Sequence, residues 1–169
     1  NNMKEQKIKR YRLGVSRTFP STHPKKGHAT GFINSILNAI EKIPFDPYTD
    51  KFKFHTIRNN YDLWVKRMAE VQSGRAVIEL FYWSGKPYRS KQVVFAVLDE
   101  NSGCGVQELD FMADNIERPC IFGNGYAVRS HISILAYNDG LSLDDFNAWF
   151  KNYDLSKPKA IIQFTNLRY

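Results

Sequence analysis

The stretch "KFKFHTIRNNYDLW", residues 51–64, begins with the two-residue alternation of a strand and continues with the start of a helix. Its first half alternates in character from residue to residue, which predicts a strand over 51–58. Either asparagine of the pair at 59 and 60 can cap a helix, and apolar residues at helical spacing behind it predict a helix that ends at Gly74. The predicted strand carries four polar side chains suited to binding or chemistry: Lys53, His55, Thr56 and Arg58.

Upstream of this stretch, "YRLGVSR" predicts a first strand over 11–17. The basic loop "TFPSTHPKKGHAT" follows, interrupted by two prolines. Thr30 is suited to cap a helix that runs through about Lys42, because the apolar residues between them fall on one face. Pro44 and Pro47 then end that helix.

Downstream, three predicted strands follow one another with turn sequences between them, before two short helices and a last strand. The predicted strands cover 75–83, 91–99, 105–111 and 159–167, and the predicted helices cover 130–138 and 143–152, the second capped by Ser142. "GNG" at 123–125 is interpreted as a turn. Strands in succession and irregularly placed helices predict an α+β protein, one domain over 1–169, built on a small, largely antiparallel β-barrel or curled sheet.

The bulk composition is that of a folded protein, with 43% hydrophobic and 14% aromatic residues among 169. Lys and Arg exceed Asp and Glu by 24 to 17, a net charge of +7 that favours a polyanionic partner. Two cysteines and four scattered histidines form no disulfide scaffold or zinc motif, so we expect no metal and no cofactor. The sequence shows no apolar run of membrane-spanning length and no signal region near residue 1, which predicts a cytoplasmic protein that binds no membrane.

The cluster around Lys53, Thr56 and Arg58 has two interpretations. If Lys53 and Thr56 converge, a lysine of lowered pKa can activate the threonine hydroxyl, and Arg58 can hold a phosphate or a base edge. On a regular strand, however, Lys53 and Thr56 point to opposite faces, so spacing alone favours an ordinary strand end. Asp145, three residues after Ser142, has a sufficient role as part of a capping box, or it faces a cleft and orients a lysine.

A second constellation, "FYWSGKPYRSKQ", interleaves aromatic and basic residues around a turn. Tyr82, Trp83 and Lys86 are suited to stack bases and hold phosphates. Arg17, which opens "RTFPSTHPKKGH", can extend the same basic surface, and a solvated loop explains it just as well. A hairpin with amphipathic side chains explains the residues of the turn equally well.

The ordered segments "KFHTIR" (53–58), "YDLW" (61–64) and "YWSGKPYRSKQ" (82–92) resemble the ASCH domains of the PUA-like superfamily, in particular the phage and bacterial branch with a K-x-x-T-I-R strand. "AYNDGLSLDDFNAWF" (136–150) and "IIQFT" (161–165) resemble later segments of the same branch. The likeness covers residues 50–169, and residues 1–49 form an N-terminal extension of strand, basic loop and helix. The resemblance implies a PUA-like β-barrel with flanking helices.

The resemblance also implies a cleft for RNA, a nucleotide or a modified base. Some small ASCH proteins are amidohydrolases that remove the acetyl group from acetylated cytidine with a Lys, a Thr and a Glu. By the resemblance, these match Lys53, Thr56 and Asp145. Asp is one methylene shorter than Glu, and a misplacement of about 1 Å can cost roughly a hundredfold in rate.

Three functions follow. The first is binding of RNA or a nucleoside in a basic cleft of the barrel, with Lys53, Thr56, Arg58 and Asp145 lining it and His55, Tyr82, Trp83, Lys86 and Arg17 contributing to the ligand surface. The second is hydrolysis of an acylated nucleoside such as acetylated cytidine, with Thr56 as nucleophile, Lys53 as base and Asp145 in support. The third is a protein-interaction module without a nucleic-acid ligand.

Overall fold

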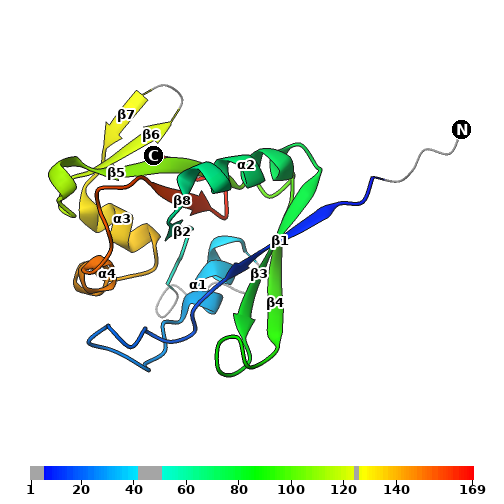
Figure 1. Cartoon of the computed structure of the whole chain (residues 1–169), viewed down its shortest axis with the longest axis horizontal. Helices are drawn as coiled ribbons and strands as arrows, with labels where there is room; N and C mark the ends of the chain where they lie inside the picture. Colours follow the sequence, from blue (N-terminus) through cyan, green and yellow to red (C-terminus); the bar gives the residue numbers. More distant parts are fainter. Residues whose placement is uncertain (1–5, 42–50, 124–125) are drawn as a thin grey trace, which may run out of the picture.

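The computed structural model of the chain describes residues 6–41, 51–123 and 126–169. In these ranges, helices and strands are mixed without regular alternation (Figure 1). In chain order the elements are β1 (Lys9–Gly14), α1 (Phe32–Ala39), β2 (His55–Arg58), α2 (Tyr61–Gln72), β3 (Ala76–Trp83), β4 (Gln92–Leu98), β5 (Gly105–Phe111), the 3-10 turn η1 (Met112–Asp114), β6 (Pro119–Gly123), β7 (Tyr126–Arg129), α3 (Ile132–Asn138), α4 (Leu143–Phe150) and β8 (Lys159–Gln163).

The strands form two sheets. One has three strands in the order β1-β3-β4, and the other has five in the order β2-β8-β5-β6-β7. Every described pairing is antiparallel except that of β1 with β3. The predicted α+β class with largely antiparallel sheets is therefore confirmed. The described strands do not close into a barrel, so the PUA-like barrel stays a prediction.

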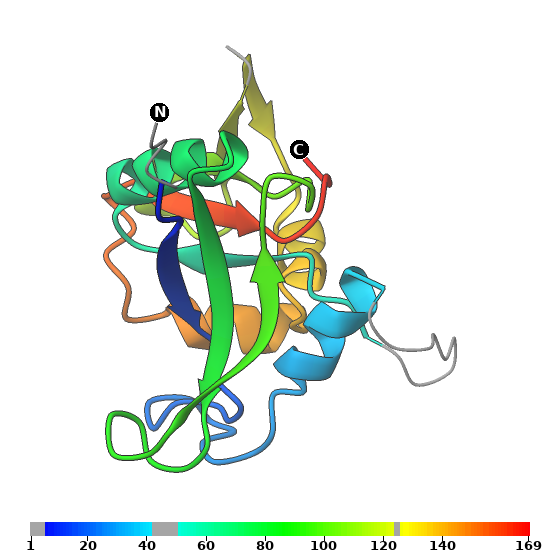
Figure 2. The same cartoon turned by 90° about the vertical axis from the view of Figure 1, so that its right-hand side faces the viewer.

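One apolar core joins the two sheets. Ile78 of β3, Leu109 of β5 and Ile161 of β8 are all fully buried in it. Phe146 of α4 is also fully buried, which ties the C-terminal helix pair to the same core. Figures 1 and 2 show the β3–β4 hairpin reaching away from the five-stranded sheet, with the loop between β1 and α1 beside its tip.

Two of the predicted helices begin at the capping residues that the sequence indicates. Asn60 caps α2: its Oδ1 accepts a hydrogen bond from the amide of Leu63 at 3.3 Å, and the helix stops before Gly74. Ser142 caps α4 in the same way, with its Oγ accepting from the amide of Asp145 at 3.2 Å. The predicted capping of this helix by Ser142 is thus confirmed.

Several predicted bounds differ from the structure, and the last strand ends at Gln163 instead of 167. The first strand covers Lys9–Gly14 instead of 11–17, and the strand predicted over 51–58 is regular only from His55. The hairpin of β6 and β7 was not predicted, although Gly123 of the predicted "GNG" turn ends its first strand.

The helix after the basic loop is α1, whose N-cap is Gly31; Thr30 accepts a hydrogen bond from the amide of Phe32 at 3.2 Å. The predicted helix end at Lys42 and the stops at Pro44 and Pro47 lie outside the described residues.

Candidate functional site

The segment before β2 is not part of the sheet. Lys53 and Thr56 therefore need not point to opposite faces, as they would on a regular strand. The Lys53 amide donates to the carbonyl of Ser35 in α1 at 3.0 Å, and the Phe54 amide donates to the carbonyl of Asn138 at the end of α3 at 2.8 Å. Only from His55 does the chain pair with β8. Lys53 is therefore not bound to strand alternation, and its side chain lines the same pocket as Thr56.

This inner pocket has a volume of about 240 Å³. Its walls come from the basic loop, the start of α1, the β2 segment, the α3–α4 turn and α4. The lining residues are Val15, Ser16, Pro20, Thr22, Phe32, Lys53, Thr56, Ile57, Arg58, Asp139, Leu141, Trp149, Phe150 and Tyr153. Pockets for drug-sized ligands measure roughly 300–1,000 Å³, so the inner pocket suits a single ring-sized group.

Lys53 and Asp139 form a buried ion pair in the inner pocket. The Lys53 Nζ donates to Asp139 Oδ1 at 2.9 Å and to the Asp139 main-chain oxygen at 2.7 Å, and it lies 4.1 Å from the centroid of the Phe32 ring. The two side chains are only 3% and 5% exposed. Burial lowers the pKa of Lys53, and Asp139 opposes that shift. Burial alone would raise the pKa of Asp139, but Lys53 and His55 together hold it below its usual value.

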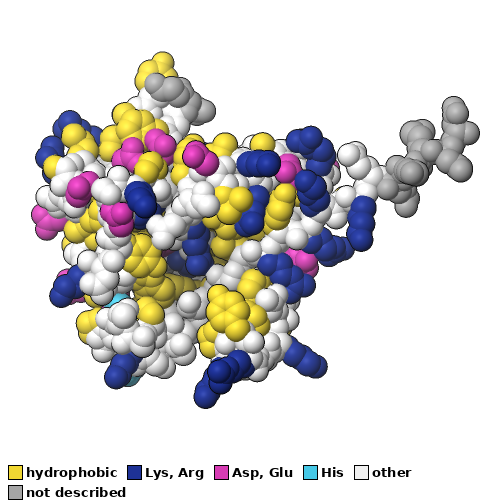
Figure 3. Space-filling view, in the orientation of Figure 1, with side chains coloured by type: hydrophobic (Ala, Val, Ile, Leu, Met, Phe, Trp, Pro, Cys, Tyr) yellow, Lys and Arg dark blue, Asp and Glu magenta, His cyan; other side chains and the backbone are white. Residues whose placement is uncertain are grey.

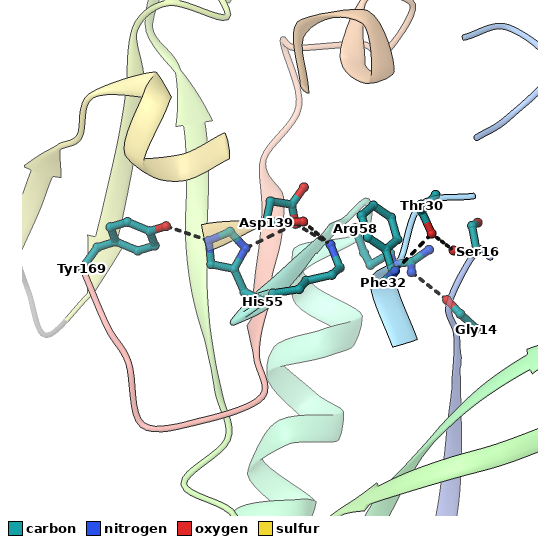
Figure 4. Close-up of polar contacts among 9 residues, drawn as sticks. Gly14, Ser16, Thr30, Phe32, His55, Arg58, Asp139 and Tyr169 are labelled. Carbon is teal, nitrogen blue, oxygen red and sulfur yellow. Dashed lines mark hydrogen bonds and ion pairs between the residues drawn. The ribbon is translucent and has the colours of Figure 1, made fainter. Parts of the chain in front are cut away.

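His55 contacts the Asp139 carboxylate and does not itself line the inner pocket. Its Nδ1 lies 3.4 Å from Asp139 Oδ1, an electrostatic contact too long and bent for a good hydrogen bond, and its Nε2 lies 2.6 Å from the Tyr169 hydroxyl (Figure 4). The same hydroxyl accepts from Asn138 Nδ2 at 2.9 Å. Burial lowers the pKa of His55 and raises that of Tyr169, so the imidazole is neutral and the phenol keeps its proton.

The protonation state follows from these contacts. Because the Tyr169 hydroxyl already accepts from Asn138, we infer that it donates to His55 Nε2, and the imidazole proton then lies on Nδ1, facing Asp139. His55, predicted to contribute to the ligand surface, is fully buried and does not line the inner pocket.

Gly140 lets the end of α3 approach Lys53. Its φ is +78°, in the left-handed region, and a Cβ there would meet the Lys53 Cβ at 3.0 Å. Asp139 is not recognisable from the sequence, because polar residues followed by a glycine are common at the end of a helix. Its only sequence signal is that it precedes the glycine that ends α3.

Asp145 lies outside the inner pocket and pairs with the basic loop. Its Oδ2 accepts from Lys25 Nζ at 2.7 Å, and His23 Nε2 lies 3.1 Å from its main-chain oxygen. Of the three residues predicted to act together, the structure brings together Lys53 and Thr56. The carboxylate beside Lys53 is that of Asp139, and Asp145 instead fastens the loop to α4.

Arg58 lies at the junction between the inner pocket and a second hollow of about 520 Å³, the outer groove. The outer groove is lined by Gly14, Val15, Ser16, Arg17, Thr18, Pro20, Arg58, Trp83, Gly85, Pro87 and Tyr88. Figure 3 shows the surface hollowed between the basic loop and the β3–β4 tip, with Lys and Arg side chains around that tip.

The other predicted ligand residues divide around this groove. Arg17 and Trp83 line it, and Arg17 Nη2 donates to the Trp83 carbonyl at 2.9 Å. Tyr82 lies beneath the Arg17 guanidinium, 4.7 Å from it, and does not line the groove. Lys86 is exposed at the hairpin tip between two lining residues, Gly85 and Pro87.

Within the described ranges, no group of three or more His, Cys, Asp or Glu side chains is arranged to hold a metal ion. Cys104 and Cys120 are buried free thiols. None of the helices in this part of the chain has the length and apolar character needed to cross a bilayer.

The chain was compared with protein-family models, with curated proteins and with solved structures, and none of the three comparisons gave a match.

Proposed function

We propose that the inner pocket binds the base of a nucleoside or of a nucleotide unit in RNA. The observation that carries the proposal is a ring-sized pocket in which the balanced Lys53–Asp139 pair and the Thr56 hydroxyl stand beside aromatic walls. The PUA-like assignment belongs to the same proposal and rests on the resemblance, with which a largely antiparallel α+β fold is compatible.

The chemistry of the pocket fits an uncharged, planar ligand with polar edges. Lys53 and Asp139 compensate each other's charge there, and Phe32 and Trp149 offer apolar ring surface. Arg58 adds one cation where the pocket meets the outer groove. Asp139 Oδ2 accepts no hydrogen bond from the described residues, so it can accept from an exocyclic amino group, as carboxylates do from cytosine N4.

Calorimetric titration with the four common nucleosides and acetylated cytidine tests the proposal. We expect saturable binding of at least one of them, weakened by Thr56→Val. Thr165→Val makes the same change outside the inner pocket and serves as control. If no nucleoside and no short RNA binds, the proposal is overturned and the protein-interaction alternative takes its place.

Amide hydrolysis is a second candidate, favoured by a buried lysine of lowered pKa in the same pocket as a threonine. The Thr56 hydroxyl oxygen forms a bond to the acyl carbon while its proton passes to the Lys53 amine in its neutral form. The amide C–N bond then breaks, the leaving nitrogen takes that proton, and water hydrolyses the acyl ester. Asp139 holds Lys53 in place.

Incubation with acetylated cytidine and chromatography of cytidine and acetate tests this candidate. We expect Thr56→Ser to retain product formation and Thr56→Ala to lose it. Wild-type binding without product would leave only the binding function, and undiminished turnover by Thr56→Ala would exclude Thr56 as nucleophile.

A further inference from the structure

The inner pocket and the outer groove differ in how their charges are compensated. In the inner pocket, Lys53 is matched by Asp139. In the outer groove, Arg58 and Arg17 have no carboxylate within 4.0 Å among the described residues, and no acidic residue lines the groove. The outer groove therefore carries two cations without a direct ion pair, one of which, Arg58, it shares with the inner pocket.

Arg58 is the less satisfied of the two. Its Nη2 donates to the Gly14 carbonyl at 2.7 Å, while its Nε is buried and has no hydrogen-bond partner in the described part of the chain (Figure 4). Burial lowers its pKa, but a guanidinium stays charged in proteins. A buried cation with a free donor is costly unless an anion reaches it, and the guanidinium fork matches a phosphate.

Aromatic rings stand at the open side of the groove. The Trp83 and Tyr88 rings lie 5.1 Å apart at 48° to each other. Tyr88 is 87% exposed and has a φ of +63°, in the left-handed region that a tyrosine rarely adopts. The turn that holds it is closed by hydrogen bonds from the Gly85 amide to Ser90 Oγ and from Ser90 Oγ to the Lys86 carbonyl, at 2.9 and 2.8 Å.

These side chains form a surface on which a base can stack, since base–aromatic stacking works for every base. A free nucleoside in the inner pocket would leave both the arginines and the rings of the outer groove unused. A strand of nucleic acid that continues out of the pocket would meet Arg58 at the junction, and Arg17, Trp83 and Tyr88 in the groove beyond it.

We propose that the outer groove binds single-stranded nucleic acid next to the base in the inner pocket, with a backbone phosphate at Arg58 and Arg17 and the neighbouring base stacked on Trp83 and Tyr88. This inference rests on the proposed function, because it names the ligand class of the same site. A terminal phosphate of a mononucleotide has the same chemistry as a phosphodiester, so the experiment separates the two.

The experiment compares, by calorimetry, the nucleoside that binds most tightly, its 5′ and 3′ monophosphates, and the dinucleotide of the same base. We expect the better monophosphate to bind on the order of tenfold more tightly than the nucleoside, and the dinucleotide on the order of tenfold more tightly again. The affinity of the dinucleotide falls with salt, by a log–log slope of about −0.7 per phosphate, and that of the nucleoside does not.

The variants are read as ratios of affinity within one protein, so that a change in folding does not enter. Arg17→Gln should reduce the factor by which the monophosphate binds more tightly than the nucleoside. Tyr88→Ala should reduce the factor by which the dinucleotide binds more tightly than the monophosphate. The matched controls Arg129→Gln and Tyr126→Ala, both on β7 at the far edge of the five-stranded sheet, change neither ratio.

Each alternative result has one meaning. Equal affinity for the monophosphate and the dinucleotide overturns the strand path, since only a terminal phosphate is then held. Equal affinity for all ligands overturns the phosphate site and leaves the proposed function standing. If none of them binds, the proposed function fails, and this inference fails with it.

Discussion

The charged ammonium of Lys53 is stabilised in the interior by several neighbouring groups. One carboxylate oxygen and one main-chain oxygen of Asp139 accept hydrogen bonds from it, and the face of Phe32 covers the ammonium. Removing one partner of such a pair leaves an uncompensated buried charge, which costs more than the pair itself contributes.

Asp139→Asn should therefore lower the free energy of unfolding by roughly 3–5 kcal/mol, measured by denaturant unfolding at pH 7. Lys25→Met removes the partner of Asp145 in an ion pair whose lysine is 54% exposed, and should cost only about 0–1 kcal/mol. The double variant Lys53→Met/Asp139→Leu should recover most of the loss. Equal costs for Asp139→Asn and Lys25→Met would contradict a buried, charged Lys53.

His55 makes stability depend on pH in a defined direction. Its pKa is lowered below the ordinary value of 6.5 in the folded state, so below that pH the unfolded chain binds a proton that the folded chain does not. The free energy of unfolding should therefore fall as the pH drops from 7.5 to 5.5, with a contribution of at most about 1.4 kcal/mol per pH unit. The lowered pKa of Asp139 acts in a separate window, below its ordinary 3.8.

Denaturant unfolding at pH 7.5, 6.5 and 5.5 measures this slope. His55→Gln should flatten it, while His28→Gln, an exposed side chain on the basic loop, should leave it as in the wild type. A slope that His55→Gln does not change would show that the pKa of this histidine is the same in the folded and unfolded states.

At the level of elements, the α3–α4 turn sets the position of Asp139. Gly140 combines a positive φ with a close approach to Lys53, whereas Gly27 has nearly the same φ, +77°, and open space around it. Substituting each glycine by alanine therefore distinguishes the cost of the positive φ from the cost of steric crowding.

Gly140→Ala should reduce the free energy of unfolding by more than about 1 kcal/mol and should also weaken nucleoside binding, because the new methyl group displaces Lys53. Gly27→Ala should show the cost of the positive φ alone, with binding intact. Denaturant unfolding and calorimetry of both variants measure the difference. Equal stability loss and equal affinity in the two would show that Lys53 accommodates the methyl group.

Elements fixed by local chemistry were predictable from sequence, and those fixed by distant contacts were not. Asn60 and Ser142 mark helix starts because a cap bonds within its own turn. The β6–β7 hairpin was missed because its strands are short and one of them, β7, is exposed, so neither shows a clear alternation. Asp139 was missed because its partner, Lys53, is 86 residues away.

At the level of the whole molecule, a single core holds both sheets, and the inner pocket is built from β2 of one sheet and from loops and helices on either side of it. A ligand there contacts segments from several parts of the chain. It should therefore stabilise the protein as a unit, with one cooperative transition.

Saturation with the bound nucleoside, at one hundred times its measured Kd, should raise the free energy of unfolding by about 2.7 kcal/mol. For a chain of this size that corresponds to a rise in Tm of roughly 5–11 °C, measured by differential scanning calorimetry. Thr56→Val should show a smaller rise at the same ligand concentration. An unchanged Tm at saturation would show that the nucleoside does not bind the folded state in preference to the unfolded chain.

The pairing of β2 with β8 also determines when the site can exist during synthesis. Thr56 is paired with Ile162, so β2 has no neighbour in its sheet until β8 has been synthesised, more than 100 residues later. The Lys53–Asp139 ion pair likewise cannot form until Asp139 has been translated, 86 residues after Lys53. If the inner pocket binds a nucleotide as proposed, that binding can begin only after β8 has left the exit tunnel.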